Sequence, residues 1–266
     1  MPVRIMSWNV WWRFGDWRAR HEAILATLRA ERPDVCGLQE VWAVRDGEHQ
    51  AELLGRELGM HWTYSPSPMP GRWHSRIGDT GVDVGNAILS RWPIGATAIG
   101  DLGGEGRTVL HARVDAPDGP IPVFTTHLDS SPAGSAGRCA QVERLLPFVA
   151  AHSAGDHPPV LTGDFNAEPD SDEVRRAGGH LTAPVVPGLV LVDAWRYHDG
   201  TEPGWTWDRR NPHVAGHGAP NARIDYIMVE LRGPGRGCVD RVHLAGTGPH
   251  RGVWPSDHFA VVADLR

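Results

Sequence analysis

The sequence predicts an α/β domain in which two β-sheets pack face to face and helices cover the outside. Segments with strand patterns greatly outnumber segments with helical spacing, and several of these strands are close enough in the chain to pair locally. Strands and helices also do not alternate as they do in a TIM barrel or a Rossmann fold. Two packed sheets with outer helices are consistent with all three observations.

The length and composition favour a single globular domain over residues 1–266. A chain of 266 residues can bury a large core, and its charged fraction of 22% is ordinary for a globular protein. No stretch is rich enough in Gly, Ser and Pro to act as a linker between domains. No internal repeat divides the chain either.

The first third of the chain contains two strands that end in polar residues. Residues 3–10 and 35–40 match strands, and residues 17–30 and 51–58 match helices. The first strand ends at Asn9 and the second at Glu40. From residue 65 to 85, Pro and Gly are so frequent that we expect no regular element. A loop of this length inside a domain is usually functional or disordered.

The rest of the chain is expected to be mainly strands. A helix over residues 138–152 should be kinked by Pro147, and a short helix is expected near residues 171–177. Residues 208–222 form a second irregular loop. The expected strands cover residues 86–90, 107–114, 121–128, 158–163, 189–195, 223–229, 238–244 and 259–263.

The stretch from Pro158 to Pro169 is the most informative part of the sequence. A short apolar strand stops at Gly163 and is followed by Asp164 and Asn166. Side chains two residues apart on an extended chain point the same way, so a carboxylate and an amide would face one spot. Ligands of open α/β sheets bind beyond the carboxyl ends of strands. The alternative is a simple turn, because Gly, Asp and Asn all favour turns.

Polar side chains recur at the ends or beginnings of other predicted strands. Such a group is costly to bury unless a cation and an anionic ligand balance it. Oxygen ligands suit Mg²⁺, whereas Zn²⁺ would require more closely spaced His or Cys. The residues are Asn9, Glu40, His127, Asp164, Asn166, Asp257 and His258, with Asp225 just inside a strand.

A set of short motifs in this order resembles the endonuclease/exonuclease/phosphatase superfamily over nearly the whole chain. The motifs are Ser-Trp-Asn-Val from Ser7, Leu-Gln-Glu-Val from Leu38, Gly-Asn-Ala-Ile-Leu-Ser from Gly85, Thr-Thr-His-Leu from Thr125, Gly-Asp-Phe-Asn from Gly163, Arg-Ile-Asp-Tyr-Ile from Arg223 and Ser-Asp-His from Ser256. The resemblance implies a four-layer α/β sandwich with two mixed sheets. It also implies a phosphodiesterase or phosphatase that uses Mg²⁺ or Mn²⁺ to assist the attack of water on a phosphoester.

The resemblance assigns the metal ligands. Glu40 is implied as the principal ligand of Mg²⁺ or Mn²⁺, with Asn9 beside it. Asp257 is implied to lie near this metal or a second one. From the sequence alone, Asp257 could instead be a turn residue, and Asn9 could serve only to bond backbone at a strand end.

The resemblance also assigns the catalytic residues. Asp164 is implied to orient or deprotonate the attacking water, and Asn166 to hold a phosphoryl oxygen. His258 is implied to contact the phosphoryl group while paired with Asp225. His127 is implied to contact the phosphate or the leaving group, although a histidine at a strand end could also be a core residue.

The substrate is less well defined by the sequence. Asn86 is implied at the phosphate, and the loop residues Trp73, Arg76 and Arg209 are further candidates for substrate contacts. A nuclease would need Arg-rich loops, and its candidates are Arg72, Arg76, Arg209, Arg210 and Arg223. A lipid phosphodiesterase would need an exposed apolar rim, for which support is thin. We therefore favour a small or soluble substrate over nucleic acid, with a Mg²⁺-dependent nuclease as the alternative.

A catalytically silent binding module is the alternative of another class. Such a relative would be expected to have lost Asp164, Asn166 or His258, and all three are present. The formal net charge of −6 and the lack of a basic run argue mildly against a general nucleic-acid binder. No signal peptide or membrane span is expected, and the odd count of 3 cysteines favours a reducing, cytoplasmic location. The pattern carries no information on oligomeric state.

Overall fold

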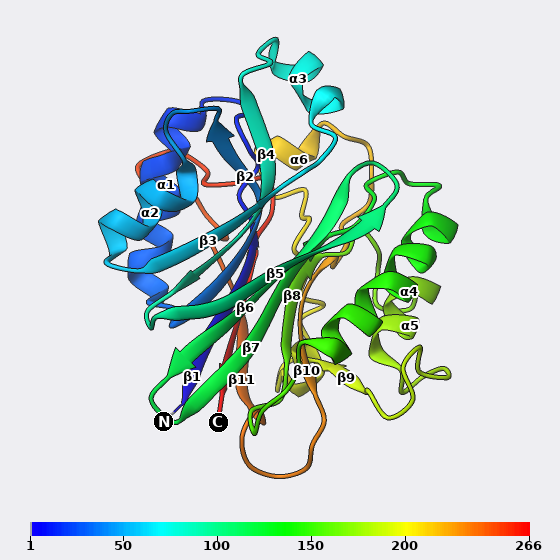
Figure 1. Ribbon diagram of the computed structural model, residues 1–266. Coiled ribbons are helices and arrows are strands. Elements are labelled where there is room, and N and C mark those ends of the chain that lie inside the picture. The colour runs from blue at the N-terminus through cyan, green and yellow to red at the C-terminus, as the bar shows by residue number, and fades with distance from the viewer. Residues whose placement is uncertain (1) are drawn as a thin grey trace.

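Two six-stranded sheets form the centre of the molecule in the computed structural model, which describes residues 2–266 (Figure 1). The first sheet has the order β11 (Val239–Ala245), β12 (Ala260–Leu265), β1 (Val3–Asn9), β2 (Val35–Val44), β4 (Val82–Ser90), β3 (His61–Pro66). The second has the order β5 (Ile94–Gly103), β6 (Arg107–Ala116), β7 (Gly119–His127), β8 (Val160–Asp164), β10 (Asp225–Glu230), β9 (Leu191–Asp193). Each sheet contains one parallel pair, β1 with β2 and β7 with β8, among antiparallel neighbours.

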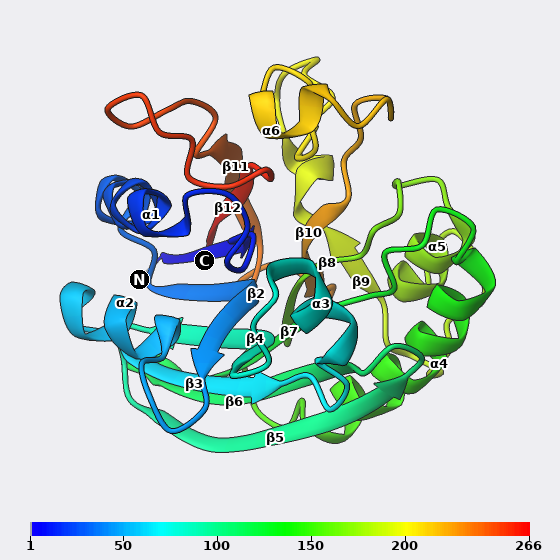
Figure 2. The same ribbon diagram turned by 90° about the horizontal axis from the view of Figure 1, so that it is seen from above.

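Helices cover the outer faces of both sheets. Helices α1 (Trp17–Glu31) and α2 (Gln50–Leu58) lie beside the first sheet, and α4 (Ser135–Ala151) and α5 (Asp172–Gly178) lie beside the second (Figure 2). The short helices α3 (Gly71–Ile77) and α6 (Pro212–Ala215) lie at one end of the sandwich. The predicted four-layer α/β sandwich is confirmed. None of the helices in residues 2–266 is both long and apolar enough to cross a membrane.

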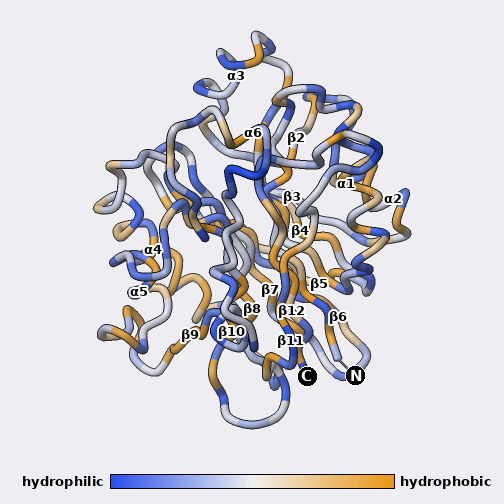
Figure 3. Tube along the Cα trace, turned by 180° about the vertical axis from the view of Figure 1, so that it is seen from behind, coloured by the Kyte–Doolittle hydropathy of each residue, from blue (hydrophilic) through white to orange (hydrophobic). Residues whose placement is uncertain are grey.

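Three apolar layers hold the sandwich together, and the strands in the middle are its most hydrophobic part (Figure 3). Between the sheets, Ile5 and Val261 pack with Val123 and Ile227 from the opposite sheet. A second cluster lies between the first sheet and its two helices, and a third lies under α4 and α5. Removing this apolar surface from water is the main force that holds the layers in place.

The two loops expected to be irregular contain regular elements. Residues 65–85 include α3, which forms because Trp73 is buried against Trp12 and Phe14, and β4 already begins at Val82. The prediction of no regular element there was wrong, because tertiary packing outweighed the Pro and Gly content. The loop 208–222 likewise contains the single turn of α6.

Other differences concern exposed or short elements. Strands β3 and β5 were not predicted, because many of their residues are exposed and their apolar pattern is therefore weak. The strand expected over 189–195 is only three residues long, and η1 (Ala194–Tyr197) follows it. Helix α4 begins at Ser135, three residues before its predicted start, and includes Pro147.

The strand directions gather the polar strand ends at one end of the molecule. Strands β1, β2, β7 and β8 run toward the end that carries α3 and α6, and the antiparallel strands β10 and β12 start there (Figure 1). Both chain termini lie at the opposite end. Polar residues far apart in the sequence therefore meet at the end that carries α3 and α6.

The two sheets approach each other closely at Gly37 on β2. A Cβ atom built on Gly37 would lie 1.9 Å from Thr162 Oγ1 and 3.0 Å from Thr125 Oγ1 of the second sheet. Thr162 Oγ1 is fixed in place because it donates to the carbonyl oxygen of Phe124 at 2.9 Å. Only glycine fits at this position without moving one sheet away from the other.

We predict that Gly37→Ala lowers the free energy of unfolding by about 1–3 kcal/mol, the usual cost of overpacking a core. Urea unfolding followed by circular dichroism measures this change. The control is Gly137→Ala in α4, where a Cβ atom meets nothing within 4 Å. That change should be neutral or stabilise by up to about 1 kcal/mol, because Ala favours the helix. Equal stability of Gly37→Ala and the unmodified protein would contradict the close approach.

Candidate active site

Three polar residues form a row across the second sheet. His127 on β7 is the register partner of Asp164 on β8, and Asp164 is the partner of Asp225 on β10. All three are at most 5% exposed. The sheet register therefore places one histidine and two carboxylates side by side, although the sequence separates them by up to 98 positions (225 − 127).

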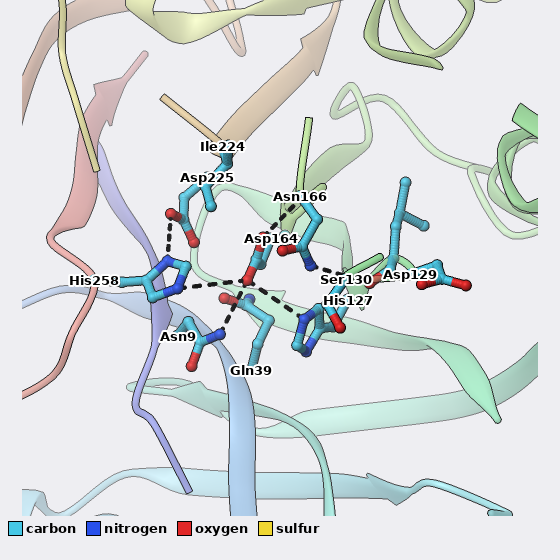
Figure 4. A network of polar contacts seen from close by, with 12 residues as sticks. Asn9, Gln39, His127, Asp129, Ser130, Asp164, Asn166, Ile224, Asp225 and His258 are labelled. Atoms are coloured by element: carbon cyan, nitrogen blue, oxygen red, sulfur yellow. Dashed lines mark hydrogen bonds and ion pairs between the residues drawn. The ribbon is translucent and has the colours of Figure 1, made fainter. Parts of the chain in front are cut away.

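Asp164 is the centre of the polar contacts (Figure 4). Its Oδ2 atom accepts a hydrogen bond from Asn9 Nδ2 at 3.0 Å and lies 3.4 Å from His127 Nε2 and 3.8 Å from His258 Nε2. Its Oδ1 atom accepts from the backbone N–H of Asn166 at 2.9 Å. Because Asn9 ends β1 of the first sheet, this carboxylate connects the two sheets at their polar ends.

His258 and Asp225 form a buried pair. His258 Nδ1 lies 2.8 Å from Asp225 Oδ2, and the backbone N–H of Asp225 donates to Thr206 Oγ1 at 3.2 Å. Burial alone would lower the pKa of His258, but Asp225, Asp257 and Asp164 together raise this pKa well above its usual value. His258 is therefore a charged imidazolium whose Nε2–H faces the centre of the site and can donate to an anionic oxygen.

The carboxylates of the site repel one another. Burial, followed by the charge of Asp225, raises the pKa of Asp164 to about 6. Burial also raises the pKa of Glu40, and it raises that of Asp257 to about 7. The shifts indicate that the site lacks positive charge for the carboxylates that it holds.

Glu40 provides the clearest sign of a missing ligand. Its side chain is buried, and its Oε2 atom has no hydrogen-bond partner within residues 2–266. The residue adopts a left-handed backbone with φ 55°, at an irregularity of the pairing between β2 and β4. Buried polar atoms are almost always paired, so an unpaired carboxylate oxygen fits a bound cation. The oxygens of Glu40, Asn9 and Asp257 match the hard ligands that Mg²⁺ prefers.

A second group of donors is less suitable for a metal. Single ligand atoms of Asp164, Asp225 and His258 all lie within 4.8 Å of one another. However, Nδ1 of His258 already pairs with Asp225 Oδ2 at 2.8 Å, whereas Glu40 Oε2 has no partner within residues 2–266. The group centred on Glu40 therefore fits a divalent cation better.

A narrow pocket adjoins the predicted metal ligands. Its lining includes Glu40, Asn86, His127 and Trp73, so the structure brings these predicted residues together. Burial, followed by the charge of Arg107, lowers the pKa of His127 well below its usual value, which leaves the imidazole neutral. Trp73 is only 4% exposed, because most of its ring packs in the aromatic cluster with Trp12.

Arg107 is a pocket residue that the sequence analysis missed. It is 6% exposed and forms no ion pair with a carboxylate in the described part of the chain. Burial, followed by the charge of Arg72, lowers its pKa to about 10, so it remains charged near neutral pH. The predicted hairpin could have identified Arg107 as a residue of the site, because the hairpin register places it close to the end of the strand that carries His127.

Trp207 was also missed as a residue of the site. Its ring lies edge-on to the imidazole of His258, with 5.0 Å between the centroids. No spacing rule in the sequence connects this tryptophan with His258.

The loop arginines that were candidates for substrate contacts do not line the pocket next to Glu40. Arg76 lies over the rings of Phe14 and Trp73, and it does not line the pocket next to Glu40. Arg209 is exposed and also lies outside this pocket. Arg210 and Arg223 were candidates for phosphate contacts in a nuclease. They form ion pairs with Asp208 and Asp193, respectively.

Helix α4 supports the loop after His127. Arg138 donates to the carbonyl oxygens of Asp129 and Ser131 at 3.1 and 2.7 Å, and it pairs with Glu173. Gln141 Oε1 accepts from the backbone N–H of Asp129. Neither residue contacts the polar cluster directly, so they act on this loop rather than in the site.

The sequence profile of the Endonuclease/Exonuclease/phosphatase family matches residues 6–258. The chain belongs to this family. The predicted resemblance to this family is thereby confirmed. The matched range begins near β1 and ends at His258, so it includes every residue of the polar cluster.

The curated relatives are longer than the region that they share with this chain. Tyrosyl-DNA phosphodiesterase 2 of Xenopus laevis is 27% identical over 165 residues, which is 60% of this chain and 41% of that protein. Protein angel of Drosophila melanogaster is 52% identical over 53 residues, which is 20% of this chain and 15% of that protein. In both comparisons the chain spans less than half of the relative's length.

Solved structures share the fold at low sequence identity. TDP2 of D. rerio complexed with single-strand DNA product has a TM-score of 0.76 at 20% identity, over 100% of this chain and 99% of that one. The human Nocturnin catalytic domain with bound sulfate also has a TM-score of 0.76, at 22% identity over 100% and 94%.

The raised pKa of Asp257 leads to a prediction about stability without metal. When a carboxyl group has a higher pKa in the folded state than in the unfolded state, the protein loses stability as the group ionises. The free energy of unfolding should therefore fall as the pH rises from about 4 to about 7. Asp257→Asn should therefore raise the free energy of unfolding by about 2 kcal/mol at pH 7.5 in EDTA, and by much less at pH 4.5. Chemical unfolding at the two pH values measures the difference.

The control for this prediction is Asp156→Asn at an exposed position. It should change stability by no more than about 0.5 kcal/mol at either pH, as most surface substitutions do. A gain for Asp257→Asn that is the same at both pH values would contradict the proposed origin of the effect.

Proposed function

We propose that the chain is a Mg²⁺- or Mn²⁺-dependent hydrolase of phosphodiesters or phosphomonoesters. The observation that carries the proposal is the unpaired Oε2 atom of buried Glu40 next to Asn9 and Asp257. These residues would hold the metal. When bound, such a metal stabilises the charge that develops on phosphoryl oxygens and lowers the pKa of water.

The other residues of the cluster would bind and orient the reactants. Asp164 has a pKa raised to about 6, which suits a group that orients water and accepts its proton near neutral pH. The imidazolium of His258, held by Asp225, would donate to a phosphoryl oxygen. Asn166 can add a neutral donor, and the neutral imidazole of His127 lies beside the pocket for the leaving group or phosphate.

A small soluble phosphoester is the first substrate candidate. The pocket beside Glu40 is narrow, and ion pairs already engage Arg72, Arg210 and Arg223. A long polynucleotide would need a series of free cations to neutralise its phosphates. The net charge of −6 also supports a substrate with few charges.

The end of a single DNA strand is the second candidate, although the sequence alone did not favour nucleic acid. Support comes from the similarity to tyrosyl-DNA phosphodiesterase 2 and from the shared fold with TDP2 complexed with single-strand DNA product. A strand end needs few phosphate contacts, and the buried cation of Arg107 beside the pocket could supply one of them.

We also propose a reducing, cytoplasmic location. Cys36, Cys139 and Cys238 are all free, which supports this assignment.

We predict that Glu40→Gln raises the Mg²⁺ concentration for half-maximal activity at least tenfold. The amide keeps the shape of the side chain but removes the charge that attracts the cation. Hydrolysis of bis(p-nitrophenyl) phosphate across a Mg²⁺ titration measures the effect, and Glu52→Gln on the exposed face of α2 is the control. An unchanged titration for Glu40→Gln would exclude it as a ligand.

We predict that His258→Ala lowers kcat by at least about 10³-fold and that Asp225→Asn lowers it by a similar factor. Because the two residues act as a pair, the double variant should be hardly slower than either single variant. The exposed His250→Ala is the control and should retain full activity. Independent, multiplying losses in the double variant would contradict the pairing.

A substrate panel separates the candidate functions. It should contain oligonucleotides with blocked ends, nucleotides, sugar phosphates and phospholipids, each tested with Mg²⁺ and with Mn²⁺. Turnover of small phosphoesters supports the first candidate, and removal of an end group from single-stranded DNA supports the second. No metal-stimulated turnover of any compound would favour a catalytically silent binding module.

A further inference from the structure

Arg20 on α1 is a buried cation without a carboxylate partner. It is 2% exposed and forms no ion pair in the part of the chain that the structure describes. Burial lowers its pKa to about 10, so the guanidinium stays charged near neutral pH. A charge this deeply buried must be stabilised by hydrogen bonds.

Backbone carbonyl groups supply all of these hydrogen bonds. The guanidinium makes six of them, between 2.7 and 3.1 Å, which use each of its three nitrogens. Carbonyl dipoles that converge on one cation stabilise it without neutralising its charge. The acceptors are the carbonyl oxygens of Val10, Trp11, Trp12, Phe14 and Pro255.

These carbonyl groups lie directly beside the proposed metal ligands. Val10 follows Asn9, and Pro255 comes two residues before Asp257. Nη1 of Arg20 bonds both carbonyl oxygens, at 2.8 Å to Val10 and 3.0 Å to Pro255. One nitrogen therefore fixes the spacing between the end of β1 and the segment before β12.

The same guanidinium stabilises a strained loop that reaches Glu40. Trp11 and Trp12 have left-handed backbones with φ 58° and 34°, a conformation that non-glycine residues rarely adopt. Nη2 of Arg20 bonds both of their carbonyl oxygens. The backbone N–H of Trp12 in turn donates to the carbonyl oxygen of Glu40 at 2.9 Å. The loop therefore links the position of Glu40 to Arg20.

Local hydrogen bonds connect the backbone near Arg20 to the side chains of the proposed ligands Asn9 and Asp257. Asn9 Oδ1 accepts from the backbone N–H of Trp11 at 2.9 Å, so the loop orients the amide that bonds Asp164. Ser256 Oγ donates to the carbonyl oxygen of Asn9 at 2.6 Å and lies 3.3 Å from Asp257 Oδ1. A change in the spacing of the two segments would therefore displace both Asn9 and Asp257.

We propose that Arg20 is a positioning residue of the metal site, which fixes the relative positions of Asn9, Glu40 and Asp257 through the carbonyl groups of their neighbours. This inference rests on the proposed metal-dependent function. A purely structural role would affect only the stability of the fold. Positioning would affect metal affinity in variants that remain fully folded.

The test compares Mn²⁺ binding by Arg20→Lys, Arg20→Met and the unmodified full chain. Electron paramagnetic resonance of free Mn²⁺ gives the affinity directly, without any substrate. Lysine retains the charge but cannot bond five carbonyl groups, so the dissociation constant should rise at least tenfold in both variants. Near-ultraviolet circular dichroism at 10 °C checks that each variant is folded.

Arg138→Lys is the matched control. Arg138 is also buried at 5% exposure and also bonds backbone carbonyl groups, but on α4 and away from Asn9 and Glu40. It should lose stability while its Mn²⁺ affinity stays within twofold of the unmodified protein. Folded Arg20 variants with affinity within twofold of the unmodified protein would overturn the proposal. Failure of the unmodified protein to bind Mn²⁺ would instead overturn the proposed function.

A second measurement needs no variant and remains decisive if both Arg20 variants fail to fold. In protein labelled with ¹⁵N at arginine, the buried Nε–H of Arg20 should exchange slowly and give its own resonance. Saturation with Mg²⁺ should shift this resonance by more than its linewidth and leave that of Arg138 in place. A resonance of Arg20 that does not respond to Mg²⁺ would overturn the proposal.

Discussion

The hydrogen bond between Asn9 and Asp164 is the contact on which the rest of the site depends, because it joins the two sheets where both present polar side chains. Asn9 belongs to the first sheet and Asp164 to the second. Each sheet orders its own residues by backbone register, but register within a sheet cannot align one sheet with the other. The apolar layer between the sheets fixes their distance, and Gly37 permits a close approach. This polar bond, with the bond from Gly163 N–H to Ser7 Oγ, then aligns the two rows of side chains into one cluster.

The cluster is arranged for chemistry at the expense of local stability. Asp164 is buried beside Asp225, and Asp257 is buried near Glu40. Burial, together with repulsion from these neighbours, raises the pKa of Asp164 and of Asp257. A fold selected only for stability would pair or replace such carboxylates. The imidazolium of His258 offsets part of the negative charge, and a divalent cation at Glu40 would offset more of it. Substrate phosphate would then meet donors that are already oriented, so little reorganisation remains for the reaction itself.

Most of the fold and most residues of the cluster could be predicted from the sequence, but the signal differs from residue to residue. Strand ends are marked by a polar residue after an apolar run, which is why Asn9 and Asp164 could be placed at one edge. The prediction that the second strand ends at Glu40 was wrong, because β2 continues to Val44 and Glu40 lies at an irregularity inside the strand. Asp225 was recognisable because a carboxylate inside an apolar strand needs a partner, and His258 lies 2.8 Å away. Helix α3 and the positions of Trp207 and Arg107 could not be obtained in this way. They depend on contacts between segments distant in the sequence, such as Trp73 with Trp12, which no local pattern records.

The row formed by His127, Asp164 and Asp225 limits which insertions and deletions such a protein can tolerate during evolution. Three strands must keep their register for these side chains to meet, and a slip of one residue would turn a side chain to the opposite face. An insertion or deletion of one residue in β7, β8 or β10 would therefore separate these three side chains. The segments that carry α3 and α6 contribute no strand to this row, although Trp73 of α3 lines the pocket and Trp207 before α6 packs on the ring of His258. Their lengths can therefore vary without shifting the row, provided that Trp73 and Trp207 keep their contacts.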